Sequence, residues 1–342
     1  MVNEKYDVVV VGGGTAGLGA ALTLGRARRT VLVIDAGAPR NAPAGHVHNY
    51  LGREGTPPGF LLAIGRAEVA GYGGEIVTGN VTSAQPVDGG FHVELADGRT
   101  VSARRLLVTT GLVDELPDVP GVAERWGRDV LHCPYCHGWE VRDQAIGILA
   151  TGPMAMHQTL LFRQWSADVT LFLHTAAALT DEQSEQLAAR GIGVVDGEVA
   201  ALEVTDDRLT GVRLTSGEVF PRQAVVVAPR FTARADVLIS LGLEPTEMQI
   251  DGYVTGSYVA ADPTGATAVT GVWVAGNVAD LRAQVLSSAT AGGNTAAAIN
   301  ADLIAEETRH AVAEHRGQRE PFSARVEQEV CELVLGDRRH GL

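Results

Sequence analysis

Two of the chain's three cysteines lie in one short stretch, HCPYCHGWE, which begins at His132. A C-x-x-C-H pattern is compatible with a haem attachment site, with part of a zinc site or with a redox dithiol. Two residues between the cysteines bring the sulfurs close enough for a disulfide that exchanges readily. His137 follows the second cysteine directly. Because an imidazole titrates near neutral pH, this residue could pass a proton to or from an incoming thiol, or it could cap a local turn.

The haem and zinc interpretations each need a feature that the sequence does not offer. Haem attachment follows export, and the N-terminal residues MVNEKYDVVVV place no cationic segment before a long apolar run. A zinc site needs about four ligands. Cys133, Cys136 and His137 could supply three, no second C-x-x-C occurs, and Cys331 stands alone. We therefore expect no metal and favour a redox dithiol over two unreactive buried cysteines.

Composition narrows the class of protein. A chain of 342 residues has room for two domains, and 45% hydrophobic with 20% charged residues is normal for a globular protein. The net charge of -14 argues against nucleic acid or an anionic membrane surface as a partner, and no stretch approaches the roughly 20 apolar residues of a membrane span. Three cysteines make no disulfide framework, so we expect a reducing, cytoplasmic setting.

The N-terminal residues predict a dinucleotide-binding βαβ unit. The apolar run from Tyr6 to Val11 is typical of a buried strand. After it come an Ala/Leu-rich helical segment and a second strand, TVLVID, that ends in an acid. The fingerprint residues are Gly12, Gly14, Gly17 and Asp35. The first glycine permits the tight turn, the second admits pyrophosphate to the helix start, the third allows close helix–strand packing, and the acid can hold a ribose hydroxyl.

Two later strands end in similar turns. RRLLVTTG predicts a strand that ends at Gly111, and the strand from Val272 to Ala275 runs into Gly276-Asn277 before a helix that begins near Gln284. With the N-terminal fingerprint, these stretches resemble the three FAD-binding segments of the pyridine nucleotide–disulfide oxidoreductases. In length and order of parts the chain is similar to the low-molecular-weight thioredoxin reductases.

This resemblance implies a fold, a cofactor and an assembly. The fold would be α/β, with two Rossmann-like, three-layer βαβ domains, the second inserted into the first. Residues 1–116 and 234–308 would form the FAD-binding domain, 117–233 the inserted NAD(P)-type domain with the cysteine pair, and 309–342 a C-terminal helical extension. The relatives are homodimers, so a homodimer is expected. The implied FAD contacts are Gly12, Gly14, Gly17, Asp35, Asn49, Gly111, Gly276, Asn277, Gln284 and Val285. Where the family usually has A-G-D, Asn277 keeps the size of the acid but loses its charge.

The nucleotide fingerprint of the inserted segment is altered. Ala150-x-Gly152-x-x-Ala155 has alanine where the first glycine is expected. The next predicted strand ends at His174, and residues 168–181 contain no Lys or Arg, although NADPH-dependent relatives carry cations here for the 2′-phosphate. We expect this domain to remain as a scaffold without its NADPH site. The alternative is a tolerated variant that still binds NAD(P)H.

The chain is similar to thioredoxin-reductase-like dithiol oxidases, which close disulfides in small natural products of the gliotoxin and holomycin type. Three features carry this resemblance: the motif C-x-x-C-H-G, the turn A-G-N and the altered nucleotide fingerprint. The similarity extends to about residue 308. It implies that Cys133 exchanges with the substrate dithiol and that Cys136 faces the flavin. Electrons would pass from the substrate to the enzyme disulfide, to FAD and then to O2, which gives H2O2. His137 stands where thioredoxin reductases usually carry an acid.

Other functions and a second group of residues stay open. The fold also suits a reductase that passes electrons from NADPH, or from a protein donor such as ferredoxin, to thioredoxin. A third possibility is a flavin-binding redox sensor, for which the cysteine pair has no evident use. His46, His48 and Tyr50 lie in a loop expected near the flavin, where they could line a substrate pocket or form an ordinary surface loop.

The last part of the chain predicts an amphipathic helix. Between Phe322 and Leu335, apolar residues recur at helical spacing on one face, namely Val326, Val330, Leu333 and Val334. We expect this face to pack against the body of the protein or a second subunit and to contribute to the homodimer. Cys331 lies on the same face and is expected to be a packed thiol.

Overall fold

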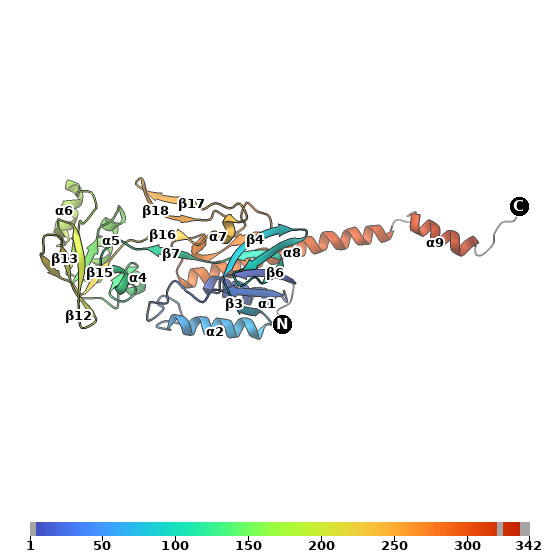
Figure 1. Ribbon diagram of the computed structural model, residues 1–342, viewed down its shortest axis with the longest axis horizontal. Coiled ribbons are helices and arrows are strands. Elements are labelled where there is room, and N and C mark those ends of the chain that lie inside the picture. The colour runs from blue at the N-terminus through green and yellow to red at the C-terminus, as the bar shows by residue number, and fades with distance from the viewer. Residues whose placement is uncertain (1–4, 320–323, 336–342) are drawn as a thin grey trace. The chain divides into compact units, whose positions relative to one another are not determined.

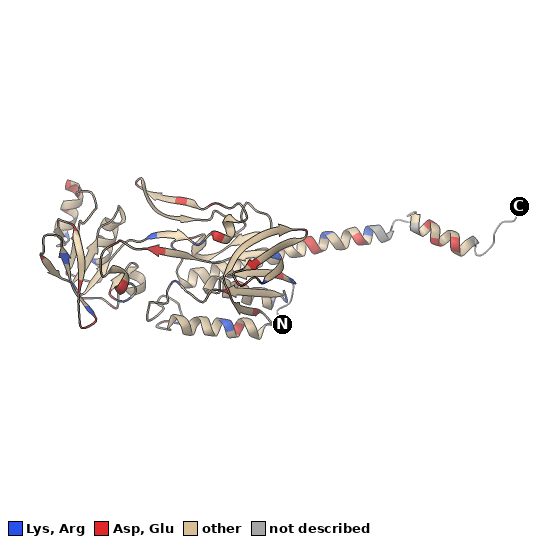
Figure 2. Ribbon diagram, viewed as in Figure 1, with Lys and Arg blue, Asp and Glu red and all other residues tan. Residues whose placement is uncertain are grey.

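The computed structural model describes residues 5–319 and 324–335 (Figure 1). The chain divides into two compact units, residues 1–297 and 298–342. In Figure 2 acidic and basic residues are interspersed along the ribbon, so the net charge of -14 is not gathered in one region of this view.

A seven-stranded sheet forms the first part of the larger unit. Its central strands are near-continuous runs of Val, Ile and Leu that are buried on both faces, as is usual for parallel strands covered by other elements. The order is β3 (Glu75–Thr78), β2 (Val31–Asp35), β1 (Lys5–Val11), β6 (Thr100–Val108), β5 (Gly90–Leu95) and β4 (Val81–Val87), with β19 (Val272–Val274) also beside β6. Pairing is parallel among β1, β2, β3, β6 and β19. It is antiparallel between β4 and β5 and between β5 and β6. The predicted strands that precede the three glycine turns are therefore confirmed.

Helices α1 (Thr15–Arg26) and α2 (Pro58–Gly71) pack on each other and contact this sheet. A glycine lets the start of α1 approach the turn after β1 closely. A Cβ atom on Gly17 would lie 2.0 Å from the carbonyl oxygen of Gly12, so only glycine fits there.

A second, all-parallel sheet lies in the chain between β6 and β19. Its strands are β11 (Gly193–Val195), β10 (Val169–Phe172), β9 (Ile146–Leu149), β15 (Ala224–Val226) and β8 (Val130–Leu131), in that order. Helices α5 (Met154–Phe162) and α6 (Asp181–Ala189) connect these strands. A small antiparallel sheet of β12 (Val199–Thr205), β13 (Arg208–Leu214) and β14 (Val219–Pro221) follows α6 and β11. A sheet with a parallel core and an all-parallel sheet, each with crossover helices, confirm the predicted α/β fold class, and the strands of the second sheet lie in the chain between strands of the first.

The two sheets are joined by strands that pair with each other. β7 (Leu112–Glu115), before the second sheet, is antiparallel to β16 (Arg230–Ala233), after it. β18 (Tyr253–Tyr258) and β17 (Thr246–Ile250) complete this four-stranded sheet. The predicted domain limits at 116/117 and 233/234 lie next to this pair, and they stay a prediction, as does the limit at 308/309.

The remaining helices are α3 (Val122–Arg125), α4 (Pro134–His137), α7 (Asp236–Ile239), α8 (Val285–Arg319) and α9 (Ala324–Leu335). No helix among the described residues is long and apolar enough to cross a membrane. On α9, Val330, Leu333 and Val334 are exposed, and so is the free thiol of Cys331. Cys331 is therefore not packed within its own unit, and cover by the body of the protein or by a second subunit stays a prediction. Phe322 lies outside the described residues.

Candidate active site

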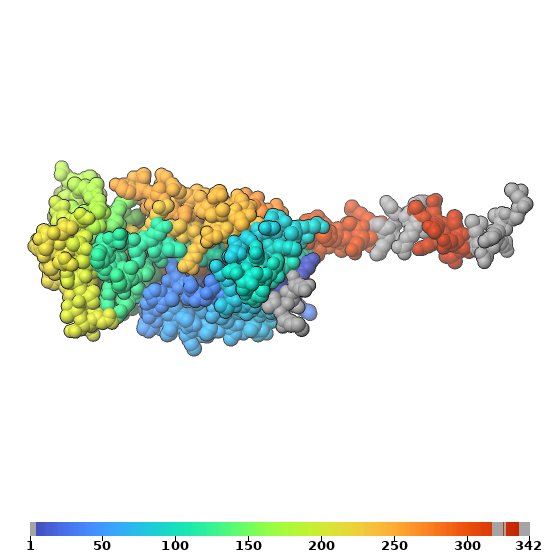
Figure 3. Space-filling view, viewed as in Figure 1, coloured from blue at the N-terminus to red at the C-terminus, as the bar shows by residue number. Residues whose placement is uncertain are grey.

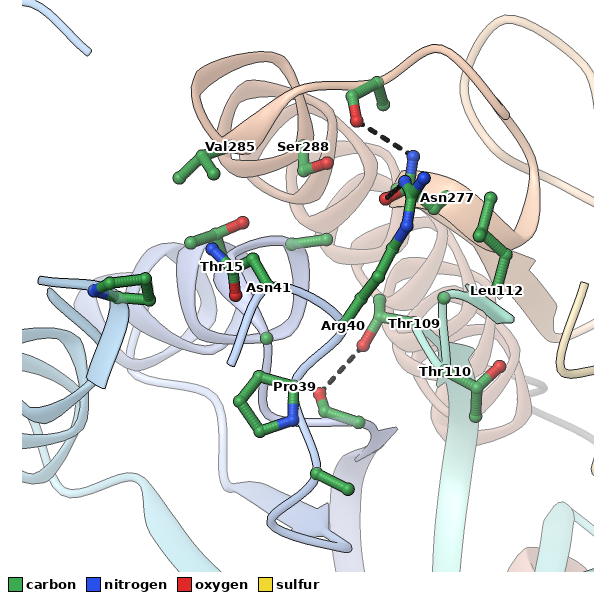
Figure 4. A pocket seen from close by; sticks show the side chains of 18 of the residues that line it. Thr15, Pro39, Arg40, Asn41, Thr109, Thr110, Leu112, Asn277, Val285 and Ser288 are labelled. Atoms are coloured by element: carbon green, nitrogen blue, oxygen red, sulfur yellow. Dashed lines mark hydrogen bonds between the residues drawn. The ribbon is translucent and has the colours of Figure 1, made fainter. Parts of the chain in front are cut away.

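A cavity of about 690 Å³ lies in the first unit, where the two sheets meet. The ends of β1, β2 and β6, the starts of α1 and α8, and the cysteine pair of α4 all line it. Parallel strands bring their carboxyl ends to one edge of a sheet, and in such folds ligands bind at that edge. Figure 4 shows part of this lining.

The glycine fingerprint has the geometry that a phosphate site requires. Gly12 has φ +107°, and a Cβ atom there would lie 2.5 Å from the carbonyl oxygen of Thr109. A Cβ atom on Gly14 would meet no protein atom within 4 Å. Gly14 lines the cavity, so the space beside its backbone is free for a ligand. Gly17 is not among the residues of the cavity wall, because its contact is with Gly12 behind the turn.

The N-terminus of α1 opens into the same cavity. Its N-cap residue, Gly14, provides no side-chain cap, and the first turn contains no acid. The N–H groups of this turn, with the positive end of the helix dipole, suit an anionic pyrophosphate. This arrangement fits the diphosphate of a dinucleotide such as FAD.

Asp35, at the end of β2, lines the cavity and is held from two sides. Its Oδ1 accepts a hydrogen bond of 3.1 Å from the Gly13 N–H. Its Oδ2 accepts one from Nη2 of Arg66, on α2. The carboxylate is thus oriented at the strand end, where a ribose hydroxyl would bind.

Asn277 is fixed by three hydrogen bonds. Its Nδ2 donates to the carbonyl oxygens of Asp280 (3.0 Å) and Ala283 (2.8 Å), and its Oδ1 accepts from Nη1 of Arg40 (3.3 Å). Arg40 reaches across the cavity from the loop after β2 (Figure 4). The same guanidinium forms two bonds of 2.6 and 2.8 Å with the buried carboxylate of Asp114. Because both amide hydrogens of Asn277 are used by carbonyls, this position needs an amide.

Four other predicted FAD contacts also line the cavity, namely Gly111, Gly276, Gln284 and Val285. Gly276 has φ +77°, and a Cβ atom there would lie 2.9 Å from that of Ala16 on α1. Gln284 directly precedes α8, and its Nε2 lies 3.9 Å from Sγ of Cys133. The start of α8 therefore links the glycine turns to the cysteine pair.

Cys133 and Cys136 form a disulfide, with their Cα atoms 5.3 Å apart, and both residues line the cavity. The next residue, His137, also lines it. Its Nε2 is buried and has no hydrogen-bond partner among the described residues. Burial lowers the pKa of His137, while the nearby Glu140 raises it and His48 lowers it. The ring is therefore neutral near pH 7 and can accept a proton.

His132, before the first cysteine, has a different environment. Its Nδ1 lies 3.0 Å from the carbonyl oxygen of Val227, to which it can only donate. The ring meets Phe231 edge-on at 5.1 Å. Burial is the main cause that lowers the pKa of His132, so the residue is neutral and held in place. It lines the cavity, although sequence reasoning gave it no role.

The loop of residues 46–56 is also at this site. His46 and His48 line the cavity, whereas Tyr50 and Asn49 are not among the lining residues. Asn49 is exposed, and its Nδ2 donates to the carbonyl oxygen of Tyr135, between the two cysteines (2.5 Å). The predicted contact of Asn49 with the flavin stays a prediction, and the structure gives Asn49 a contact with α4.

The nucleotide turn of the inserted segment is poorly equipped for a phosphate. Ala150 is buried, and Pro153, immediately before α5, has no N–H to offer. His174, after β10, accepts a hydrogen bond of 3.1 Å at Nδ1 from the Val199 N–H. Burial lowers the pKa of His174, so this residue is a neutral structural group.

Sequence reasoning missed four charged residues at or beside the cavity: Arg40, Arg66, Glu54 and Glu140. Only Glu140 lies in a stretch that had drawn attention. The others stand in loops or on an ordinary helix, and no spacing rule marks them.

Comparisons with known proteins agree with this geometry. The family model described as pyridine nucleotide-disulphide oxidoreductase matches residues 6–297. Thioredoxin reductase sirT of Leptosphaeria maculans is 31% identical over 312 residues, 86% of this chain and 93% of the relative. Thioredoxin reductase aclD of Aspergillus oryzae is 30% identical over 288 residues, 81% of this chain and 90% of the relative.

Two solved structures are similar over most of the chain. The crystal structure of HlmI has a TM-score of 0.85 and 47% identity, and covers 93% of this chain and 99% of its own. The crystal structure of an oxidoreductase from Agrobacterium tumefaciens has a TM-score of 0.82 and 35% identity, and covers 88% of this chain and 99% of its own. The predicted resemblance to thioredoxin reductase-like enzymes is confirmed, and these enzymes use FAD. The chain therefore belongs to the pyridine nucleotide-disulphide oxidoreductase family and is an FAD-binding oxidoreductase.

Proposed function

We propose that the protein is a dithiol oxidase, which closes a disulfide in a small-molecule dithiol of the natural-product type and passes the electrons through FAD to O2, with formation of H2O2. One observation carries the proposal. The Cys133–Cys136 disulfide lines the same cavity as the FAD fingerprint, with a neutral histidine beside it. The nucleotide turn of the inserted segment, in contrast, lacks cations and one N–H group.

The protein's own residues account for the exchange of sulfur bonds. A substrate thiol loses its proton, and the resulting thiolate attacks Sγ of Cys133. The Cys133–Cys136 bond breaks, and its electron pair remains on Cys136. The second substrate thiol loses its proton and attacks the mixed disulfide, which releases Cys133 as a thiolate and the substrate as a disulfide. Two electrons have then moved from the substrate to the cysteine pair.

His137 is the candidate base for these proton transfers. Its ring is neutral near pH 7, and its Nε2 is buried without a hydrogen-bond partner among the described residues, so this nitrogen can take up a proton once a substrate thiol reaches it. Bound FAD supplies a two-electron acceptor that can be reoxidised by O2. The assignment of Cys133 to the substrate and of Cys136 to the flavin follows the family resemblance.

Anaerobic reduction tests the direction of electron flow. Purified yellow protein is mixed with excess dithiothreitol and, separately, with excess NADPH, and the visible flavin absorbance is followed. We expect dithiothreitol to bleach the flavin rapidly, NADPH to bleach it little, and admission of air to restore the colour with H2O2. Rapid bleaching by NADPH would instead support the reductase alternative, and no bleaching by either would refute both.

A pair of cysteine variants assigns the route. Cys136→Ser should abolish reduction by the dithiol while the protein stays yellow. Cys331→Ser is the matched control, because it removes the exposed cysteine of α9, and it should react like the unsubstituted protein. A Cys136→Ser protein that is still reduced at the original rate would show that the electrons bypass the disulfide. The expected homodimer can be measured separately by light scattering.

A further inference from the structure

We propose that Asn49 is a positioning residue that holds the cysteine pair in place for electron transfer to FAD. Its side chain donates a hydrogen bond of 2.5 Å to the carbonyl oxygen of Tyr135, which lies between the two cysteines in the chain. This bond is called the tether below. The inference rests on the proposed function, in which electrons pass from the cysteine pair to the flavin, and it assigns the side chain of Asn49 to the protein rather than to the cofactor.

The loop of residues 46–56, which carries Asn49, is closed by its own backbone. The Val47 N–H donates to the Thr56 carbonyl (2.8 Å), and the Gly55 N–H donates back to the Val47 carbonyl (2.9 Å). The side chain of Val47 is buried and lines the cavity. The closed loop is therefore anchored at the cavity wall.

The backbone of Asn49 orients its side chain before it meets Tyr135. Its φ is +58°, in the left-handed region that asparagine, aspartate and glycine tolerate best. Such a conformation persists where the surrounding structure holds it. Here the Asn49 N–H donates to Oε2 of Glu54 (2.9 Å), and Oε1 of Glu54 lies 2.5 Å from Nδ1 of His48. Glu54 thus braces the loop from within.

The Tyr135 carbonyl belongs to the single turn of α4 that holds the cysteine pair. The N–H groups of Cys136 and His137 both donate to the Cys133 carbonyl, at 3.2 and 3.1 Å. The disulfide closes the same turn through its side chains. Because the tether binds the middle of this turn, it limits the movement of both sulfurs relative to the cavity wall.

Two further contacts join the same stretch of chain to the inserted segment. Nε2 of His48 lies 3.5 Å from Oε1 of Glu140, and this pair supports the tether only weakly because both side chains are partly exposed. Gly127 packs so closely on Pro43 that a Cβ atom on Gly127 would lie 2.8 Å from that of Pro43. In Figure 3 the blue surface of the loop region borders the green surface that includes α4.

The two parts of the proposed reaction depend differently on the tether. In the first, a dithiol opens the Cys133–Cys136 bond and leaves as a disulfide, which requires access to Cys133. In the second, the S–S bond of the pair forms again, and two electrons and the thiol protons leave it, with FAD as the electron acceptor. Transfer to a bound cofactor requires a sulfur at a fixed place, since a misplacement of about 1 Å can lower a rate about 100-fold. The tether therefore acts on the second part.

Anaerobic reduction by dithiothreitol, at a concentration that makes disulfide opening fast, separates the two parts. Bleaching of the flavin in stopped flow reports electron transfer, and acid quenching followed by thiol labelling of Cys133 and Cys136 reports opening. Asn49→Gly keeps the left-handed backbone and removes the tether, whereas Asn49→Asp keeps the shape but cannot donate to a carbonyl.

In both variants we expect opening at the unsubstituted rate and bleaching about tenfold to a hundredfold slower, so that opened cysteines accumulate. Asp251→Gly is the matched control, because Asp251 is exposed and also has a left-handed backbone, at φ +50° in the turn between β17 and β18. It should change neither rate.

The outcomes separate this inference from the function on which it rests. If dithiothreitol does not reduce the unsubstituted protein, the proposed function is refuted and the tether with it. If it does, and both Asn49 variants bleach at the unsubstituted rate, only the tether is refuted. Opening and bleaching that slow together would show that Asn49 merely stabilises the segment, and variants purified without FAD would show that Asn49 holds the cofactor. Either result refutes the tether.

Discussion

Replacement of Asn277 by aspartate restores the residue that the family usually carries, and the structure predicts that it harms this protein. Both hydrogens of the Asn277 amide are donated to carbonyl oxygens, those of Asp280 and Ala283. An aspartate would direct a carboxylate oxygen at these two carbonyls. The segment concerned leads into Gln284 and the start of α8, which line the FAD cavity.

The magnitude follows from the bonds that change. Each lost N–H···O bond costs about 1 kcal/mol, and the two carbonyls left facing a carboxylate add repulsion. In return, the bond from Arg40 gains a charged acceptor, which recovers about 1 kcal/mol. The net expectation is a loss of about 1–2 kcal/mol, which lowers the thermal midpoint by a few degrees.

Release of FAD on heating is the direct assay, because flavin fluorescence rises when the cofactor leaves the protein. Asn277→Asp should release FAD at a lower temperature and bind added FAD more weakly. Gln183→Glu is the matched amide-to-acid control, since the Oε1 of Gln183 accepts from the Thr180 N–H at the start of α6 and a carboxylate can replace it. A release temperature for Asn277→Asp at or above that of the unsubstituted protein would refute the reasoning.

Two further predictions concern the fingerprint and an ion-pair network. Gly14→Ala should yield folded protein with weakened FAD binding, because its Cβ would enter only the cavity. Gly17→Ala should fail to fold properly, because its Cβ would meet a carbonyl oxygen at 2.0 Å. Equal amounts of folded, yellow protein for the two variants would contradict this prediction. Hydrogen bonds from Arg128 and a second arginine lower the pKa of Asp207 to about 2 from 3.8. The stability that this carboxylate contributes is therefore complete above about pH 4 and disappears as the pH falls toward 2. Asp207→Asn should denature more easily than its control Asp206→Asn in urea at pH 7, with the difference vanishing near pH 2, and a gap that persists there would refute the assignment.

Local patterns in the sequence predicted the strands that carry the glycine turns, and the family resemblance supplied the arrangement of two domains. The apolar runs that end in glycine turns predicted β1, β6 and β19, since a parallel strand buried on both faces has few alternatives to valine, isoleucine and leucine. The glycines at 12 and 17 were predictable because only glycine tolerates the backbone contacts made there. The C-x-x-C pair likewise predicted a disulfide, because its spacing already brings the sulfurs together.

Other parts of the site depend on residues that meet across long stretches of chain. Arg40 and Asn277 are 237 residues apart, and Asn49 and Tyr135 are 86 apart. Nothing in the sequence near Arg40 marks it as the partner of Asn277. The exposure of Cys331 was also not predictable, because a helical stripe indicates an apolar face but not what covers it.

By itself, the sequence determined the class of chemistry. Glycine turns after buried strands predict a dinucleotide site, and two cysteines at this spacing predict a redox dithiol. Both patterns can be recognised in the sequence because they are short-range constraints on the backbone. Only the tertiary structure decided which groups serve that chemistry. It placed His48 between Glu54 and Glu140, left Nε2 of His137 without a partner among the described residues, and fixed the amide of Asn277. The physical reason is that protonation and orientation depend on burial and on neighbours in space, and distant segments become neighbours only when the chain is folded.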